Sequence, residues 1–566
     1  MSGIPLNLLT WLLALLPILV MLAALVLLRW PAHLAAIASW VAAILLASAV
    51  FGATPYGLAI ACAKGLSLSL FVLLIVWAAV FLYNLVDRLG GVQVIADHLV
   101  RATDDSLLRA LLLAWGFAGF LQGIAGFGAP VAAVAPLLVM MGVSPVVAVA
   151  SAMVGHSWAI TFGSMGSSYY AIQLVTRLPG EVIGPWMAAM FYLPILVTGF
   201  AVLHLNAGWP GVRRGAPAVL LAGTAMSAGM VLLNLLGAAP ISSMLPALAG
   251  CGLIWLLGRT GLYRRRPDPA PGSALTPTLS QAERGSGSPF THRLGDFASG
   301  PNGPDAPEGG QGVRSGPSPL SFHLAFLPYY LLIVLTVLSQ LDAVKALTAG
   351  LAFGVDYPAT STALGYQVPA ERAYAKIRLV GHPAPLIALA SVLSYLVYRR
   401  VSCWRPGAAS GALATTARRS VKSGLTIAFM VMMAVVVNDA GMAWLLARGV
   451  QATTNGVYPA LAPYLGVLGA FITGSNTNSN IMFGPLQLQT AQALGVSAIL
   501  ISAAQSIGGS LGAGISPDKS VIGGAVTGLA GKEDRIMRRA LPYALAATLA
   551  VGIETWLLVY VAGLAP

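Results

Sequence analysis

Charged residues are scarce in this 566-residue sequence. Only 9% of its residues are Asp, Glu, Lys or Arg, whereas soluble domains carry roughly 25%. Cysteine is also scarce, and Cys62, Cys251 and Cys403 have neither the spacing of metal ligands nor an even number for a disulfide framework. With 57% hydrophobic residues, no set of soluble domains could hide the apolar surface from water. A secreted disulfide scaffold, a disordered chain and a nucleic-acid-binding domain are excluded, and a membrane protein with many spans is favoured.

Motifs of familiar enzymes are missing as well. The sequence has no GxxxxGK[ST] loop, so ATP cannot drive a process from this chain. It has no HExxH motif and no paired cysteine ligands for zinc. We therefore predict no enzymatic activity, no cofactor and no metal site, and an enzyme with a less familiar site is the weaker alternative.

Long apolar runs predict membrane-spanning helices, because a span needs about 20 apolar residues. Twelve runs qualify, at residues 8–28, 33–51, 66–85, 145–163, 185–205, 216–237, 240–258, 322–341, 381–398, 420–438, 497–515 and 540–562. Two further stretches, 107–142 and 458–495, are interrupted by glycine and polar residues. If each interrupted stretch enters and leaves the membrane on the same side, all the clusters of Lys and Arg lie on one side of the membrane. The positive-inside rule makes that side cytoplasmic, with both termini and the loop 342–382 outside.

Residues 267–321 differ from the rest, since 20 of these 55 residues are Gly or Pro. Such a segment cannot bury enough apolar area to offset chain entropy, so we predict a disordered cytoplasmic linker. It would separate a first transmembrane repeat at 1–205, followed by two connecting helices at 206–266, from a second repeat at 322–566.

An internal repeat relates the two interrupted stretches. Phe120-Leu121-Gln122-Gly123 matches Phe471-Ile472-Thr473-Gly474, and Gly142-Val143-Ser144 matches Gly495-Val496-Ser497. The charge map gives the two copies opposite orientations. Inverted repeats with paired broken helices are typical of secondary transporters. We predict an all-α polytopic membrane protein with about twelve transmembrane helices and two broken, re-entrant hairpins in inverted repeats.

The two breaks carry the candidate binding residues. Glycines in the first break permit a tight reversal and a close approach of backbone to a ligand, while amides and hydroxyls in the second can donate and accept hydrogen bonds. A small-residue packing face is the alternative for the first break, and an ordinary loop is the alternative for the second. The predicted substrate-binding residues are Gln122, Gly123, Gly126, Gly128, Thr473, Gly474, Ser475, Asn476, Thr477, Asn478 and Asn480.

Three ionisable residues are candidates for ion coupling, because such residues within spans are functional by default. They are His156, Asp439 and Asp518. A histidine bonded to a backbone carbonyl and an acid facing water at the interface are the alternatives for the first two. Asp518 and Lys519 could equally form a plain interfacial pair.

At these breaks the sequence resembles the L-lactate permease family, which includes glycolate permeases. The resemblance lies in residues 120–132 and 471–480 and in the later segment Ile515-Ser516-Pro517, and it covers most of 65–205 and 420–560. It implies a multi-pass symporter of the prokaryotic cytoplasmic membrane that takes up a 2-hydroxymonocarboxylate with a proton. In many members Gln122 and Asn476 are replaced by Glu and Asp, so the neutral residues here leave the coupling ion open between proton and sodium.

We therefore expect a secondary active transporter that takes up L-lactate or a related 2-hydroxymonocarboxylate, such as glycolate, by proton symport with alternating access. The alternative is an ion-coupled or uncoupled carrier, or a channel, for another small organic anion.

Overall fold

The computed structural model describes residues 5, 7–126, 128–263 and 320–563. The predicted linker lies outside the described residues except for Leu320 and Ser321. The first half contains α1 (Leu8–Val26), α2 (Ala32–Ala49), α3 (Pro55–Arg88), α4 (Gly91–Val100), α5 (Ser106–Leu111), η1 (Leu112–Phe117), α6 (Ala118–Ile124), α7 (Ala129–Met140), α8 (Pro145–Gly155), η2 (Ser157–Ala159), α9 (Gly163–Thr176), α10 (Gly180–Met190), α11 (Tyr192–Leu235), η3 (Ala239–Ile241) and α12 (Met244–Gly258).

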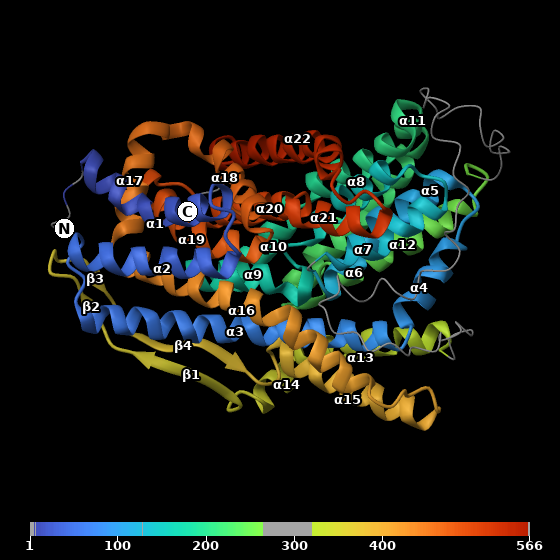
Figure 1. The fold of residues 1–566 in the computed structure, drawn as a ribbon, viewed down its shortest axis with the longest axis horizontal. Coiled ribbons are helices and arrows are strands. Elements are labelled where there is room, and N and C mark those ends of the chain that lie inside the picture. Colours follow the sequence, from blue (N-terminus) through green and yellow to red (C-terminus); the bar gives the residue numbers. More distant parts are fainter. Residues whose placement is uncertain (1–4, 6, 127, 264–319, 564–566) are drawn as a thin grey trace.

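The second half contains four strands among its helices. Its elements are α13 (Phe322–Ser339), α14 (Asp342–Leu347), β1 (Ala352–Tyr357), β2 (Thr360–Ser361), β3 (Gln367–Val368), β4 (Glu371–Arg378), α15 (Pro383–Arg400), α16 (Ala408–Asp439), α17 (Met442–Thr454), η6 (Asn455–Val457), α18 (Tyr458–Thr473), α19 (Asn476–Leu494), α20 (Ala498–Gly514), α21 (Pro517–Thr527) and α22 (Glu533–Tyr560). Figure 1 shows the long helices running along the longest axis of the molecule.

The number of spans agrees with a polytopic membrane protein. Within the described residues, ten helices are long and apolar enough to cross a membrane, or eleven when one bent pair counts as a span. At 1.5 Å per residue, the 44 residues of α11 extend roughly 66 Å, about twice the ~30 Å hydrocarbon core. The helix is broken at Gly208, where φ is 61° and ψ is −159°, so it accommodates most of the predicted runs 185–205 and 216–237. The predicted fold class is confirmed, and a count of twelve is consistent with this arrangement.

Equivalent helices of the two halves run in opposite directions. Near the start of α3, Lys64 contacts Asp439 at the end of α16, whereas near the end of α3, Asn84 donates to Thr416 in the first part of α16. The two long helices are therefore antiparallel, and Gly65 permits their close approach because a Cβ there would lie 2.7 Å from the Met432 backbone. Opposite orientation of equivalent elements is the arrangement of an inverted repeat.

Packing between the halves is reciprocal. Helix α1 packs on α17 while α13 packs on α4, and α2 packs on α16 while α15 packs on α3. In the same way α9 packs on α19 and α21 packs on α7. Each contact recurs with the two halves exchanged, as a pseudo-two-fold axis requires.

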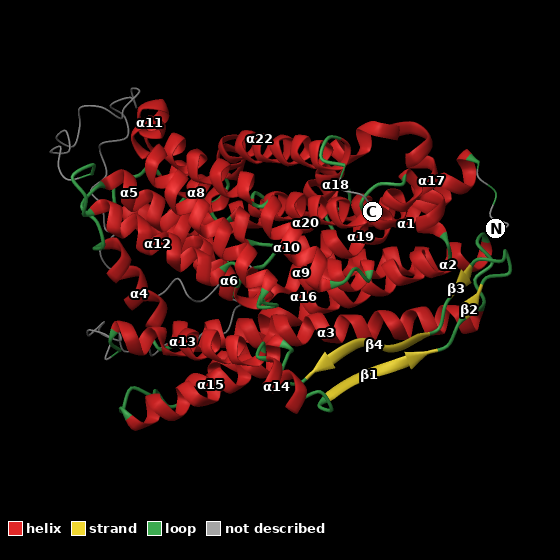
Figure 2. Cartoon of the chain, turned by 180° about the vertical axis from the view of Figure 1, so that it is seen from behind, coloured by secondary structure: helices red, strands yellow, loops and turns green. Residues whose placement is uncertain are grey.

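A hairpin covers α3 at one end of the molecule. Strand β1 pairs antiparallel with β4, and Val355 lies opposite Tyr374 in the register. Figures 1 and 2 show both strands alongside α3, and β4 contacts that helix. This structure lies in the segment 342–382, which the sequence analysis treated only as an external loop.

Both predicted breaks occur where local signals place them. Gly474, with φ of 72°, ends α18, and the Ser475 side chain accepts a hydrogen bond from the Asn478 amide at the start of α19. In the first break, Ala125 is extended after α6, and Gly128, with φ of 82°, precedes α7. Pro130 stands in the first turn of α7, where its missing N–H costs no hydrogen bond.

A further bend was not predicted. The run 145–163 was expected to be one span, but α8 ends at Gly155, and the α8–η2 segment meets α9 at 52°. Ser164 and Met165 have positive φ values of 46° and 57°. Such values are rare outside glycine, so sequence signals alone do not predict this bend.

We predict that Gly508→Ala destabilises the protein, because a Cβ at Gly508 would lie 1.9 Å from the Pro463 carbonyl oxygen between α20 and α18. Overpacking of this kind costs ~1–3 kcal/mol. The measurement is the midpoint of thermal unfolding of the purified protein in detergent. Gly252→Ala is the control, since nothing lies within 4 Å of that Cβ position in α12. Equal midpoints for the two variants would contradict the proposed packing.

Candidate functional site

The two breaks line one cavity. Its volume is about 320 Å³, at the lower end of the ~300–1,000 Å³ typical of ligand pockets. Most of the residues that line it are of polar types, and they include the glycine and polar residues Gln122, Gly126, Ser164, Ser167, Ser168, Thr473, Gly474, Ser475, Asn476, Thr477, Asn478, Asp518 and Lys519. Residues 351 positions apart in sequence, such as Gln122 and Thr473, thus meet at one place.

Eight of the eleven predicted binding residues line this cavity. The other three are Gly123, Gly128 and Asn480. Gly123 allows close packing, because its Cβ position lies 2.7 Å from Met244, and Gly128 lies against Ile522. Asn480 donates to Ser506 Oγ at 2.8 Å and to the Ser168 carbonyl oxygen at 2.9 Å. These three residues shape the surroundings of the cavity.

Three lining amides, Gln122, Asn476 and Asn478, present oxygen atoms without a hydrogen-bond partner among the described residues. The Gln122 and Asn478 side chains are 3% and 5% exposed, and neither Gln122 Oε1 nor Asn478 Oδ1 has a hydrogen-bond partner among the described residues. A buried amide oxygen without a partner costs free energy. A hydroxyl group of a bound molecule would satisfy either oxygen.

Neighbouring side chains fix the two breaks to each other. Asn476 Nδ2 donates to Thr161 Oγ1 at 2.9 Å, and Ser168 Oγ lies 2.9 Å from Thr477 Oγ1. In the first break, the Gly126 amide donates to Ser164 Oγ at 2.8 Å. Helix α9 therefore contacts both breaks at once.

Several half-helix N-termini surround the cavity. Residues at or near the starts of α9, α19 and α21 line it, among them Ser164, Asn476 and Asp518. The first N–H groups of a helix lack intrahelical partners, and the helix dipole places partial positive charge there. The arrangement therefore favours an anion. The polar run Gly163-Ser164-Met165-Gly166-Ser167-Ser168 is the sequence signal that could have identified the contribution of α9.

The proposed coupling residues occupy three different environments. Asp518 lines the cavity. His156 is fully buried outside that lining, where its Nδ1 lies 2.6 Å from the Ala152 carbonyl oxygen and its Nε2 has no partner among the described residues. Asp439 lies in a separate ionic network, which the sequence analysis did not predict.

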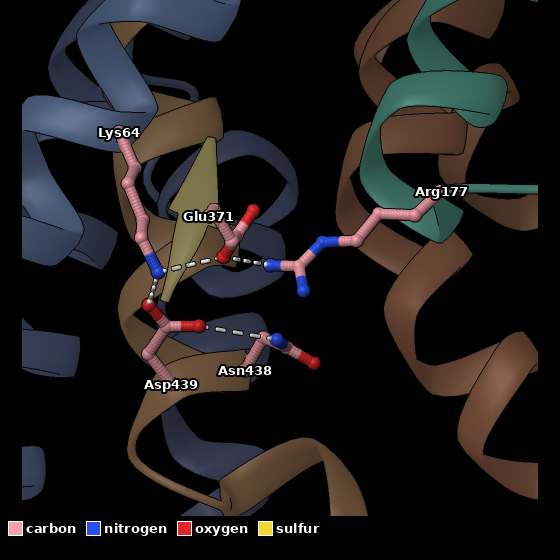
Figure 3. A network of polar contacts seen from close by, with 5 residues as sticks. All are labelled: Lys64, Arg177, Glu371, Asn438 and Asp439. Carbon is pink, nitrogen blue, oxygen red and sulfur yellow. Dashed lines mark hydrogen bonds and ion pairs between the residues drawn. The ribbon is translucent and has the colours of Figure 1, made fainter. Parts of the chain in front are cut away.

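That network joins four elements (Figure 3). Lys64 Nζ of α3 lies 3.1 Å from Asp439 Oδ2 at the end of α16 and 2.8 Å from Glu371 Oε1 on β4. Arg177, which follows α9, also binds Glu371 Oε1, at 2.7 Å. Asn438 Nδ2 donates to Asp439 Oδ1 at 3.2 Å. The side chain of Lys64 is fully buried, so both acids compensate a charge that has no access to water.

Among the described residues, no group of three or more His, Cys, Asp or Glu side chains is arranged to hold a metal ion.

Comparison with known proteins gives consistent matches along the chain. The family model described as L-lactate permease matches residues 10–264 and 316–562. Glycolate permease GlcA of Escherichia coli (strain K12) is 30% identical, over 97% of this chain and 96% of that protein. The L-lactate permease of the same organism is 29% identical over the same shares. The L-lactate permease of Bacillus subtilis (strain 168) is 30% identical, over 85% of this chain and 84% of its own.

Among solved structures, the YdaH transporter of Alcanivorax borkumensis matches with a TM-score of 0.42 and 15% identity, over 87% of this chain and 86% of that chain.

We predict that Lys64→Met lowers the stability of the protein strongly, by ~3–5 kcal/mol, because it leaves the buried Asp439 without a cation, while Glu371 keeps Arg177. The measurement is thermal unfolding in detergent. Arg538→Met is the control, since Arg538 and Asp534 form an exposed pair at 4.0 Å, and exposed pairs of this type contribute only ~0.3–0.5 kcal/mol. A Lys64→Met protein as stable as the control would contradict the interpretation of the network.

Proposed function

The chain belongs to the L-lactate permease family, and from this premise we propose that it takes up L-lactate or a related 2-hydroxymonocarboxylate, such as glycolate, by proton symport with alternating access. The observation that carries the proposal is the shared cavity of the two breaks. It supplies partial positive charge for a carboxylate and unpartnered amide oxygens for a hydroxyl group. The names of the relatives support lactate and glycolate as the substrates to test first.

The substrate pose follows from these two kinds of group. The carboxylate faces the helix N-termini around residues 164–168 and 475–478, while the hydroxyl donates to Gln122 Oε1 or Asn478 Oδ1. Neutral side chains at Gln122 and Asn476 add no negative charge that would repel the anion. A polar break inside a bilayer is tolerated where it lines such a cavity.

The distribution of exposed residues supports an inward-open conformation. Pro31, Lys422 and Asp518 are exposed residues of the cavity lining, and the first two are close in sequence to the basic residues Arg29 and Arg418. By the positive-inside rule this side is cytoplasmic. Arg88, the basic residue at the end of α3, lies on the cytoplasmic side by the same rule. Lys64 lies 24 residues before it in the helix, or about 36 Å away at 1.5 Å per residue. The ionic network therefore lies toward the opposite, outer side.

The network is suited to keep that outer side closed. Arg177 follows α9, which lines the cavity at its start, and Glu371 connects Arg177 to Lys64 on the antiparallel α3–α16 pair. Movement of α9 away from this pair would separate Arg177 from Glu371. Breaking the network is thus a requirement for opening outward, and its re-formation stabilises the inward-open state.

We predict that Gln122→Ala and Asn478→Ala each lower the rate of uptake at subsaturating substrate by about tenfold, because a lost hydrogen bond at a buried site costs ~1–3 kcal/mol. The measurement is uptake of labelled L-lactate and glycolate into proteoliposomes with an imposed proton gradient. Gln93→Ala, which removes an exposed amide on α4, is the control. Uptake by both cavity variants at the parental rate would place the site elsewhere, and uptake that never exceeds equilibrium would favour the channel alternative.

We predict that Glu371→Gln makes the cavity more accessible from the outer side. Ser167→Cys, introduced in a variant without Cys62, Cys251 and Cys403, reports accessibility to a membrane-impermeant maleimide. Labelling of right-side-out vesicles should be about tenfold faster with Glu371→Gln, if the lost ion pairs shift the equilibrium by ~1.4 kcal/mol. Arg372→Gln, on the same strand but exposed, should leave the labelling rate unchanged. Equal rates for both variants would argue against a closing role for the network.

A further inference from the structure

The cavity contains a buried cation that forms no ion pair with an acid of the described residues. Lys519 of α21 is 3% exposed, and its Nζ donates to the Gly474 carbonyl oxygen and to Ser516 Oγ, both at 3.3 Å. No carboxylate of the described residues lies within 4.0 Å of its Nζ. A buried ammonium group is costly unless an anion compensates it. Because Lys519 lines the cavity, a bound carboxylate can supply that compensation.

Asp518, the preceding residue, lines the same cavity and is exposed. Its Oδ1 lies 2.9 Å from the position that a Cβ of Gly474 would occupy. Both charged side chains therefore reach Gly474, at the second break, from the first turn of one helix. Among the residues that line the cavity, Asp518 is the one acid, and the other ionisable groups are His33, Lys422 and Lys519.

We propose that Lys519 binds the carboxylate of the substrate and that Asp518 takes up the coupled proton, so that the two neighbours form the coupling pair. This inference rests on the proposed function. It assigns the proton to α21, whereas the two breaks carry neutral residues at Gln122 and Asn476.

The charge balance explains why substrate and proton move together. In the empty cavity, Lys519 and the ionised Asp518 sum to zero. A bound carboxylate neutralises Lys519 and leaves the charge of Asp518 uncompensated, so Asp518 accepts a proton from water in the cavity and becomes a neutral acid. The pair and its bound substrate then sum to zero again. States with only one of the two ligands carry net charge, which is costly to move through the membrane interior.

Other charged groups near the pair do not replace it. His33 and Lys422 line the cavity, whereas His156 lies outside the lining. Neither histidine is hydrogen-bonded to the pair in the structure as described. Asp439 forms an ion pair with Lys64.

The test compares two kinds of transport in proteoliposomes. Asp518→Asn imitates the protonated acid, so it should exchange labelled for unlabelled L-lactate or glycolate and yet fail to accumulate the acid when a proton gradient is imposed. Lys519→Gln should lower both exchange and net uptake by at least about tenfold, because removing one partner of a buried charge pair is costly on that scale. Lys519→Arg, which keeps the charge, should recover part of the exchange. Asp534→Asn and Lys532→Gln, both exposed, serve as matched controls.

A second measurement does not depend on transport. When substrate is added to the purified protein in weakly buffered detergent solution, a pH indicator should report about one proton taken up per bound acid for the parent and none for Asp518→Asn. Accumulation by Asp518→Asn at the parental level, or proton uptake equal to that of the parent, would overturn the assignment of Asp518. Exchange by Lys519→Gln at the parental rate would overturn that of Lys519. If the parent transports neither acid, the proposed function fails and this inference fails with it.

Discussion

Every backbone N–H and C=O group within a bilayer must find a partner inside the protein, and this requirement governs the molecule. Two helical stretches are interrupted, and at each break a side-chain hydroxyl accepts a hydrogen bond from a backbone amide. The Gly126 amide donates to Ser164, and the Asn478 amide donates to Ser475. The breaks are therefore stable only as long as they are enclosed by α9, α20 and α21. That enclosure forms a polar cavity in a chain with otherwise few polar groups.

Among the described residues, the buried Lys and Asp side chains, Lys64, Asp439 and Lys519, lie at two levels of the structure. One level is the cavity, where Lys519 and Asp518 lie beside the second break. The other is the network of Lys64, Asp439, Glu371 and Arg177. Helix α9 links them, because its start lines the cavity and Arg177 follows its end. In the mechanism that we propose, a change at the cavity that displaces α9 would therefore reach the ionic network.

The breaks were predictable because their causes are local. Gly474 followed by Ser475 ends one helix and caps the next, and Pro130 begins a helix after Gly128. The partners of Asp439 were not predictable, since Lys64 is 375 residues away in sequence. Lys64 lies just before the predicted span 66–85, although it is buried in α3. The role of Lys519 was missed because sequence spacing does not reveal that one member of an adjacent pair is buried and the other exposed.

The bend between α8 and α9 escaped prediction for a different reason, since the residues with left-handed φ values include Ser164 and Met165 and not only glycine. Tertiary contacts override local preference there. The central claim is that the two interruptions together bind one small acid within the membrane. The most direct test is a cryo-electron microscopy map of the protein in lipid nanodiscs with L-lactate or glycolate. The account predicts density for the acid between Gln122, Asn478 and Lys519, whereas density at any other position, or breaks that do not share a cavity, would contradict it.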